Sequence, residues 1–130
     1  MTAAEEARDL LEAADRDVRA IRGMQDGETF ADEVFGFHAQ QAAEKLFKAW
    51  IVCLGSEYPL THNLIVLLGL LEELGCDVSR FWDLARYNAF AVQFRHAQFD
   101  GLEGELDRTE VTERVEDLAR HVASVVAKPD

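Results

Sequence analysis

The chain has 130 residues, of which 48% are hydrophobic and 29% are charged, an ordinary balance for one folded domain. Its formal net charge of −12 argues against an extended basic surface for duplex nucleic acid, although it allows a small local group of cations. The longest apolar run, from Leu64 to Leu71, is too short to cross a bilayer, so we expect no membrane partner.

Five helices and no strand are predicted, and the first two are the longest. Thr2-x-x-Glu5 has the form of a capping box, which begins a helix over residues 2–22. Its apolar residues follow the period of 3.6 residues that one buried helical face requires. The second helix begins near Asp32 and continues to about Leu54, and Gly55 is expected to end it.

Two shorter helices are predicted next. Thr61 is expected to cap the third helix, whose leucines form an apolar stripe and which ends at Gly75. Ser79 is expected to cap the fourth helix, which is rich in aromatic residues. The sequence leaves open whether this helix bends near Asn88.

The last helix follows a predicted loop. Residues 98–107 contain two glycines and four carboxylates, which favours a loop. Asp107 and Glu110 then have the spacing of a second capping pair, followed by valines and a leucine on one helical face. Without an internal repeat or a linker, these elements predict one all-α domain over residues 1–130, with antiparallel helices joined by short loops.

The middle of the second helix carries a polar stripe, formed by His38, Gln41, Lys45 and Lys48. Steps of three and four residues place these side chains on one helical face. One interpretation is a solvated face, where Glu44 and Lys48 form an i,i+4 ion pair that contributes about 0.3–0.5 kcal/mol. The other is a polar wall that lines a cleft or an interface. The spacing alone leaves both interpretations open.

The same helix and the segment after it resemble a known family. The run FHAQQAAEKLFKA at 37–49 and the run PLTHNL at 59–64 are similar to the pattern of small HEPN proteins (higher eukaryotes and prokaryotes nucleotide-binding). The run AVQFRH at 91–96 also looks like a segment of that family. The resemblance spans roughly residues 30–127.

This resemblance implies a fold and a set of functions. The fold is an antiparallel up-and-down bundle of four or five helices, of the nucleotidyltransferase substrate-binding-domain (HEPN) type, that forms a homodimer. Some family members are partners of a minimal nucleotidyltransferase, some are metal-independent ribonucleases and toxins, and others have unknown ligands. A role with nucleotides or RNA is therefore expected.

The ribonucleases of this family use an arginine, four to six intervening residues and a histidine. A cation can hold the scissile phosphate while an imidazole acts as acid or base near neutral pH. Here Arg95 is followed directly by His96, which does not fit that spacing. Arg114 and His121 have six residues between them, but they lie in the last helix rather than at the family's arginine segment. These four residues remain the catalytic candidates, and we favour a protein that is not an enzyme.

The candidate ligand contacts combine the polar stripe with two residues outside it. Lysine and arginine side chains would neutralise a phosphate, and glutamine and histidine side chains would orient the ligand. The candidates are His38, Gln41, Lys45, Lys48, His62 and Arg95. Structural roles stay open for three of them: a surface position for Arg95, a helix-start position for His62 and a core position for His38.

Cofactors, metals and compartment follow from what the sequence holds. It has no Gly-rich phosphate loop and no recurring Glu-x-x-His pair of a di-iron bundle, so we expect no cofactor and no metal. The first residues are acidic and lack the apolar run of a secretory leader, which favours a cytoplasmic location. We therefore expect the thiols of Cys53 and Cys76 to be reduced.

These expectations lead to one functional hypothesis and two alternatives. The hypothesis is a nucleotide- or RNA-binding accessory module that acts with a minimal nucleotidyltransferase partner in a toxin–antitoxin-like pair. The first alternative is a ribonuclease toxin that its partner neutralises. The second is a purely structural dimerisation module. The acidic surface favours a nucleotide, an RNA end or a small substrate over duplex DNA.

Overall fold

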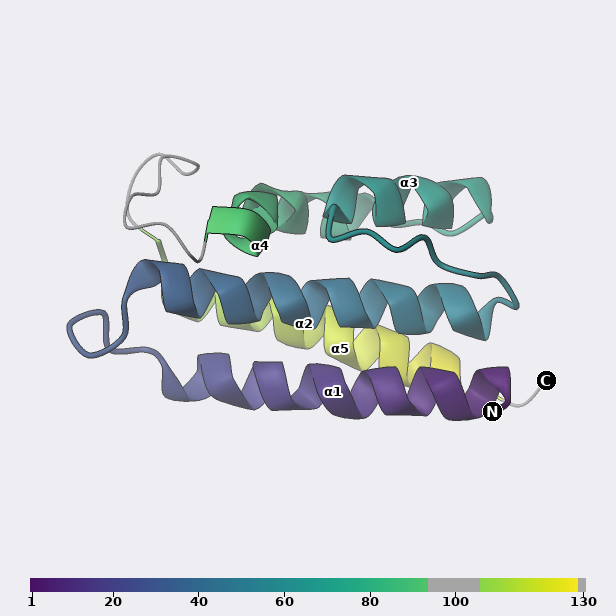
Figure 1. Cartoon of the computed structure of the whole chain (residues 1–130), viewed down its shortest axis with the longest axis horizontal. Helices are drawn as coiled ribbons and strands as arrows, with labels where there is room; N and C mark the ends of the chain where they lie inside the picture. Colours follow the sequence, from purple (N-terminus) through teal and green to yellow (C-terminus); the bar gives the residue numbers. More distant parts are fainter. Residues whose placement is uncertain (94–105, 129–130) are drawn as a thin grey trace.

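The computed structural model of the chain describes residues 1–93 and 106–128 (Figure 1). These residues form helices and no strand, which confirms the predicted all-α bundle. In chain order the elements are α1 (Ala3–Gly23), α2 (Asp32–Cys53), α3 (Leu64–Glu73), the 3₁₀ helix η1 (Ser79–Ala89), α4 (Phe90–Gln93) and α5 (Arg108–Ala127).

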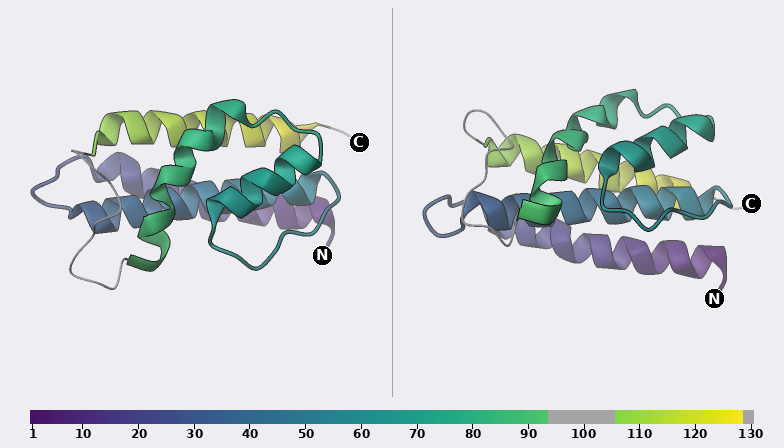
Figure 2. Two further views of the ribbon diagram at one scale, coloured as in Figure 1. Left: turned by 90° about the horizontal axis from the view of Figure 1, so that it is seen from above. Right: turned by 45° about the horizontal axis from the view of Figure 1, so that its top comes forward.

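Helix α2 lies at the centre of the bundle. Helices α1 and α2 run antiparallel beside each other, and α5 packs along both of them (Figure 1). On the other side, α3, η1 and α4 cover α2 (Figure 2). Because α2 packs against every other helix, it buries apolar residues around most of its circumference, including Phe35, Ala39, Phe47 and Ile51.

Several predicted helix ends are confirmed. The Thr2 side chain accepts a hydrogen bond from the backbone N–H of Glu5 at 3.1 Å, and the Asp107 side chain accepts one from Glu110 at the same distance. Gly55 and Gly75 follow the ends of α2 and α3 with φ angles of +80° and +89°. Residues with a side chain rarely adopt these angles, so glycine ends both helices.

Two predicted caps are wrong. Asn63 caps α3 in place of Thr61, because its side-chain oxygen accepts the N–H of Ile65 at 2.9 Å. The Thr61 hydroxyl instead accepts the N–H of Asn63 at 3.0 Å. Ser79 is the first residue of η1 rather than its cap, and its N–H donates to the Asp77 carboxylate at 3.0 Å. Short polar side chains compete for the same N–H groups, which makes caps uncertain by one or two positions.

The predicted fourth helix consists of two parts. It is a 3₁₀ helix up to Ala89 and an α-helix from Phe90. Just before this change, the Asn88 amide accepts the N–H of Leu64 at 2.6 Å and donates to the Asn63 side chain at 2.7 Å. Asn88 therefore connects the end of η1 to the first turn of α3. Most of the predicted 98–107 loop lies outside the described residues.

None of the helices within 1–93 and 106–128 has both the length and the apolar character that crossing a bilayer requires.

Candidate functional site

The polar stripe on α2 lies between two other elements of the fold. On one side of the stripe, Asp17 of α1 accepts hydrogen bonds from two stripe residues, His38 and Lys45. The Nδ1 atom of His38 lies 2.9 Å from one carboxylate oxygen of Asp17, and the Nζ atom of Lys45 lies 2.6 Å from the other. The Asp17 side chain is only 10% exposed. We call these three residues the Asp17 cluster.

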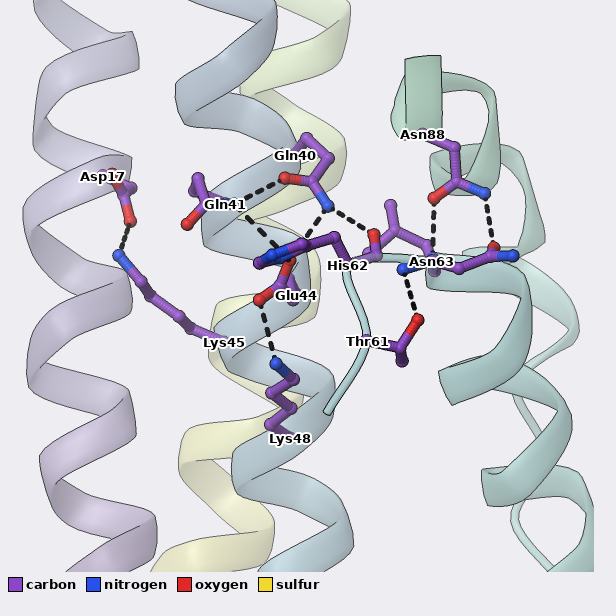
Figure 3. Close-up of polar contacts among 11 residues, drawn as sticks. Asp17, Gln40, Gln41, Glu44, Lys45, Lys48, Thr61, His62, Asn63 and Asn88 are labelled. Atoms are coloured by element: carbon purple, nitrogen blue, oxygen red, sulfur yellow. Dashed lines mark hydrogen bonds and ion pairs between the residues drawn. The ribbon is translucent and has the colours of Figure 1, made fainter. Parts of the chain in front are cut away.

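On its other side, the stripe meets the segment before α3 (Figure 3). The Glu44 carboxylate accepts the Lys48 ammonium at 2.9 Å on one oxygen and the Nδ1 atom of His62 at 2.9 Å on the other. Gln40 donates to the same carboxylate at 3.2 Å and to the backbone oxygen of His62 at 2.8 Å. Gln40 therefore holds the segment that carries His62. We call these four residues the Glu44 cluster.

Gln41 lies on α2 between the two clusters (Figure 3). Its amide donates to Gln40 at 2.8 Å and reaches Glu44 at 3.4 Å. The stripe therefore lies between α1, which it contacts through the Asp17 cluster, and the segment before α3, which it contacts through the Glu44 cluster. Figure 3 also shows that Thr61, Asn63 and Asn88 fix the end of that segment through hydrogen bonds.

The two clusters repeat one arrangement: a buried carboxylate binds one lysine and one histidine. In each imidazole, Nδ1 binds the carboxylate, so Nε2 is the atom that it can offer to a ligand. The His62 side chain is 68% exposed and that of His38 is 30% exposed. With both imidazoles neutral, each lysine balances one carboxylate, so the Asp17 and Glu44 clusters are electrically neutral within a chain of net charge −12.

The surroundings of Glu44 keep it ionised. Burial alone would raise its pKa, but hydrogen bonds from Lys48, His62 and Gln40 outweigh burial. The pKa of Glu44 is therefore lowered from its ordinary value. A charged Glu44 fixes both the Lys48 ammonium and the orientation of the His62 ring.

This geometry corrects one interpretation of the stripe. The predicted Glu44–Lys48 ion pair is present, but its placement on a solvated face is wrong. The side chains of Glu44 and Lys48 are 6% and 11% exposed, and Lys48 also lies over the ring of Tyr58, 5.2 Å from the ring centre. Lys48 is thus enclosed by its partners, whereas His62 forms the exposed edge of the same cluster.

The catalytic candidates on α5 have separate partners. Arg114 binds Asp83 at 2.7 Å and Glu110 at 2.9 Å. The Nδ1 atom of His121 accepts a hydrogen bond from Arg80 at 3.2 Å, so His121 is neutral in this contact. The structure therefore places Arg114 and His121 in different hydrogen-bonded groups. Arg95 and His96 lie outside the described residues.

His121 of α5 packs as a structural residue against α2 and η1. Its ring centre lies 4.6 Å from that of Trp50 and 5.6 Å from that of Phe81, in edge and tilted arrangements. Burial lowers the pKa of His121, and the Arg80 guanidinium lowers it further. These contacts favour a neutral imidazole that contributes to packing.

Sequence reasoning missed the residues that organise the site. Asp17 lies three residues after Ala14 and four before Ile21, on the apolar face of α1, and a carboxylate at such a position normally has a partner. Gln40 is fully buried and lies one turn before Glu44. A polar residue at a position on the apolar face of a predicted helix was therefore the sequence feature that could have identified Asp17 and Gln40 as site residues. Among the residues that the structure describes, no three His, Cys, Asp or Glu side chains are grouped as metal ligands.

Comparison with known proteins decides the family. A protein-family model described as the HEPN domain matches residues 7–127, nearly the whole chain. The chain belongs to the HEPN family. This membership confirms the resemblance carried by the α2 motif and supports a module with a nucleotide- or RNA-related role. No curated protein and no solved structure matches this HEPN chain significantly.

Proposed function

We propose that this HEPN protein binds a nucleotide or an RNA end on the polar stripe and His62. It would act as a homodimeric accessory module of a minimal nucleotidyltransferase, in a toxin–antitoxin-like pair. The observation that carries the proposal is the pair of imidazoles, His38 and His62, that buried carboxylates orient through Nδ1. Membership in the HEPN family supports the ligand class.

The contacts divide the work among the stripe residues. Lys45 and Lys48 already neutralise Asp17 and Glu44, so they keep the surface from repelling an anion. The direct ligand contacts then fall to the imidazoles and to the Gln41 amide. Because Nδ1–H donates to the carboxylate, Nε2 of a neutral imidazole accepts a hydrogen bond from a ligand hydroxyl, whereas Nε2 of a protonated imidazole donates one to a phosphate. Protonation of either imidazole would add a positive charge and strengthen phosphate binding.

The binding of a nucleotide is tested with AMP and ATP at millimolar concentration. We expect them to raise the melting temperature of the wild-type protein and to shift NMR signals of α2 and of residues 59–63. Replacing His62 with alanine should weaken this binding by about tenfold or more, because a charge-assisted hydrogen bond contributes roughly 1.5–3 kcal/mol. The matched control is Lys128→Ala, which removes an exposed cation far along the chain.

Two results would contradict this proposal. The first is the absence of any shift in melting temperature and NMR signals at millimolar nucleotide. The second is equal binding by His62→Ala and wild-type protein. The Lys128→Ala variant should bind nucleotide as the wild type does. Weaker binding by this variant would instead indicate a general attraction of anions to exposed cations.

The partner is tested separately. If the neighbouring reading frame encodes a short nucleotidyltransferase, co-expression with a tag on one chain should recover both chains in a fixed ratio. Failure of the two purified chains to associate would exclude this partner and leave the ligand proposal in place.

The oriented imidazoles also favour a second candidate, a metal-independent ribonuclease. A carboxylate that fixes Nδ1 of an imidazole leaves Nε2 ready to accept or donate a proton, which is the arrangement of a general base or acid. Incubation with RNA in the presence of EDTA tests this function in the same protein preparations. Cleavage that disappears in His62→Ala would support it, and intact RNA would contradict it.

A further inference from the structure

Helix α3 is apolar on the face that points away from the core. The core face carries the buried Leu64 and Leu68, whereas Ile65 and Val66 on the other face are 51% and 44% exposed. Leu60, just before the helix, is 97% exposed. A helix that is apolar on all sides is normally covered on all sides. The exposed face of α3 is therefore suited to contact with another protein.

A groove runs along this exposed face. Its volume is about 540 Å³, and it lies between α3 and the segment that precedes it. The apolar residues of its lining are Tyr58, Pro59, Ile65, Val66, Gly69 and Leu70. The protruding side chains of α3, Ile65 and Val66, lie on the same face as the groove. Two identical faces can therefore pack so that these side chains of each copy contact the groove of the other.

Gly69 lies in the middle of this face, and no contact within the chain requires a glycine at this position. A Cβ atom added to Gly69 would meet nothing within 4 Å. Alanine would therefore fit, and it stabilises a helix interior better than glycine does. The missing side chain does allow a second helix to approach the α3 backbone closely.

The charges along α3 favour one orientation of that second helix. Glu72 and Glu73 lie at the C-terminal end, and α3 contains no basic residue. The N-terminal end has the positive end of the helix dipole, beside the exposed His62. A parallel neighbour would place the carboxylates of two helices together. An antiparallel copy instead places each acidic end beside the other copy's N-terminal end.

We propose that a second copy of this chain packs on the exposed face of α3, with the two α3 helices antiparallel and crossing near Gly69. Glu73 of each copy then lies near the N-terminus of the other copy's α3 and its His62. This interface rests on the homodimer in the proposed function and is independent of nucleotide binding.

The first test is the mass of the protein by light scattering at tens of micromolar. We expect the wild-type chain to have twice the mass of a monomer. Val66→Glu places a charge on both sides of the symmetric interface and should raise the dimer dissociation constant by at least about tenfold. The matched control Ala123→Glu, at an exposed position of α5, should remain dimeric. Both variants should keep the wild-type circular dichroism spectrum.

The orientation is tested by a disulfide at the crossing point. Gly69→Cys should form a covalent dimer under mild oxidation, because a two-fold axis near Gly69 brings the two Cα atoms within about 4.4–6.8 Å. Mass spectrometry then locates the bond between the two introduced cysteines. Glu73→Lys should weaken the dimer, because two lysines would face the N-terminal ends of α3.

Three outcomes would overturn the interface. They are a monomeric wild-type chain, a dimer that Val66→Glu leaves intact, and a Gly69→Cys variant that forms no cross-link. A monomer that binds lipid vesicles through α3 would assign the face to a membrane instead. A dimer that binds no nucleotide would contradict the ligand site alone, and a monomer that binds nucleotide would contradict the interface alone.

Discussion

At the scale of single residues, Glu44 determines the geometry of the candidate site. It fixes Lys48 and His62 and is itself almost fully buried. Glu44→Gln keeps the shape but leaves the Lys48 ammonium without its counter-charge. We expect a loss of about 2–4 kcal/mol in the free energy of unfolding, because breaking a buried ion pair leaves an uncompensated charge. Urea denaturation at pH 7 measures this loss.

The control for this prediction is Glu110→Gln, which removes a pair with Arg114 that is largely exposed. Such exposed pairs contribute about 0.2–1 kcal/mol. The pH dependence adds a second measurement. Because the pKa of Glu44 is lowered in the folded state, its contribution is complete above the ordinary value of 4.5 and is lost as the pH falls through the folded value. The stability difference between wild type and Glu44→Gln should therefore shrink below about pH 4.5. A constant difference between pH 7 and pH 3 would contradict this role.

The sequence predicted the stripe but not its partners, for a physical reason. Helical periodicity alone places His38, Gln41 and Lys45 on one face. Their partner Asp17 belongs to another helix, and the register between two helices depends on packing that local spacing does not determine. For the same reason, local spacing could not predict the contact between Glu44 and His62, which lie 18 positions apart in the chain.

At the scale of helices, the contact between α2 and α4 depends on Gly36. A Cβ atom added there would lie 2.4 Å from the ring of Phe90, which is buried. Gly36→Ala should therefore cost about 1–3 kcal/mol through overpacking, although alanine favours a helix interior by about 1 kcal/mol over glycine. Thermal and urea denaturation measure the net effect.

The matched control is Gly23→Ala in α1, where an added Cβ meets nothing within 4 Å. This substitution should leave the stability unchanged or raise it slightly. Equal effects of the two substitutions would show that the approach of Phe90 does not require a glycine. Stabilisation by Gly36→Ala would lead to the same conclusion.

Helices were easier to predict than their boundaries. Apolar periodicity and the glycines at positions 55 and 75 identify α2 and α3, because a left-handed backbone strongly favours glycine. The caps at Thr61 and Ser79 failed because Asn63 and Asp77 offer competing oxygens within two residues. The fourth helix divides at Ala89, next to Asn88, whose contacts with α3 no local pattern shows.

At the scale of the whole molecule, Arg108 connects parts of the chain that are far apart in sequence. It begins α5, and its side chain is only 7% exposed. It donates to the backbone oxygens of Met24 at 2.7 Å and Phe30 at 2.6 Å, and to Asp32 at 2.8 Å. Its guanidinium also lies over the ring of Phe35, 5.0 Å from the ring centre. No sequence pattern predicts this role, because an arginine in the first turn of a helix is normally exposed.

The last prediction follows from this connection. Arg108→Met fills similar space but leaves two backbone oxygens and a carboxylate without their donor. We expect a loss of about 2–4 kcal/mol in the free energy of unfolding. Because Arg108 joins α5 to the loop between α1 and α2, the whole bundle should still unfold in one transition at lower urea. The fluorescence of the two tryptophans, Trp50 and Trp82, and the helical circular dichroism signal should then change together.

The control for this prediction is Arg120→Met, at an arginine of α5 whose side chain is 72% exposed. Substitutions at such positions usually change stability by no more than about 0.5 kcal/mol. If Arg108→Met behaved like Arg120→Met, the buried guanidinium would contribute no more than an exposed one. If α5 instead unfolded before the rest of the bundle, the two signals would separate, and Arg108 would stabilise α5 alone rather than the whole molecule.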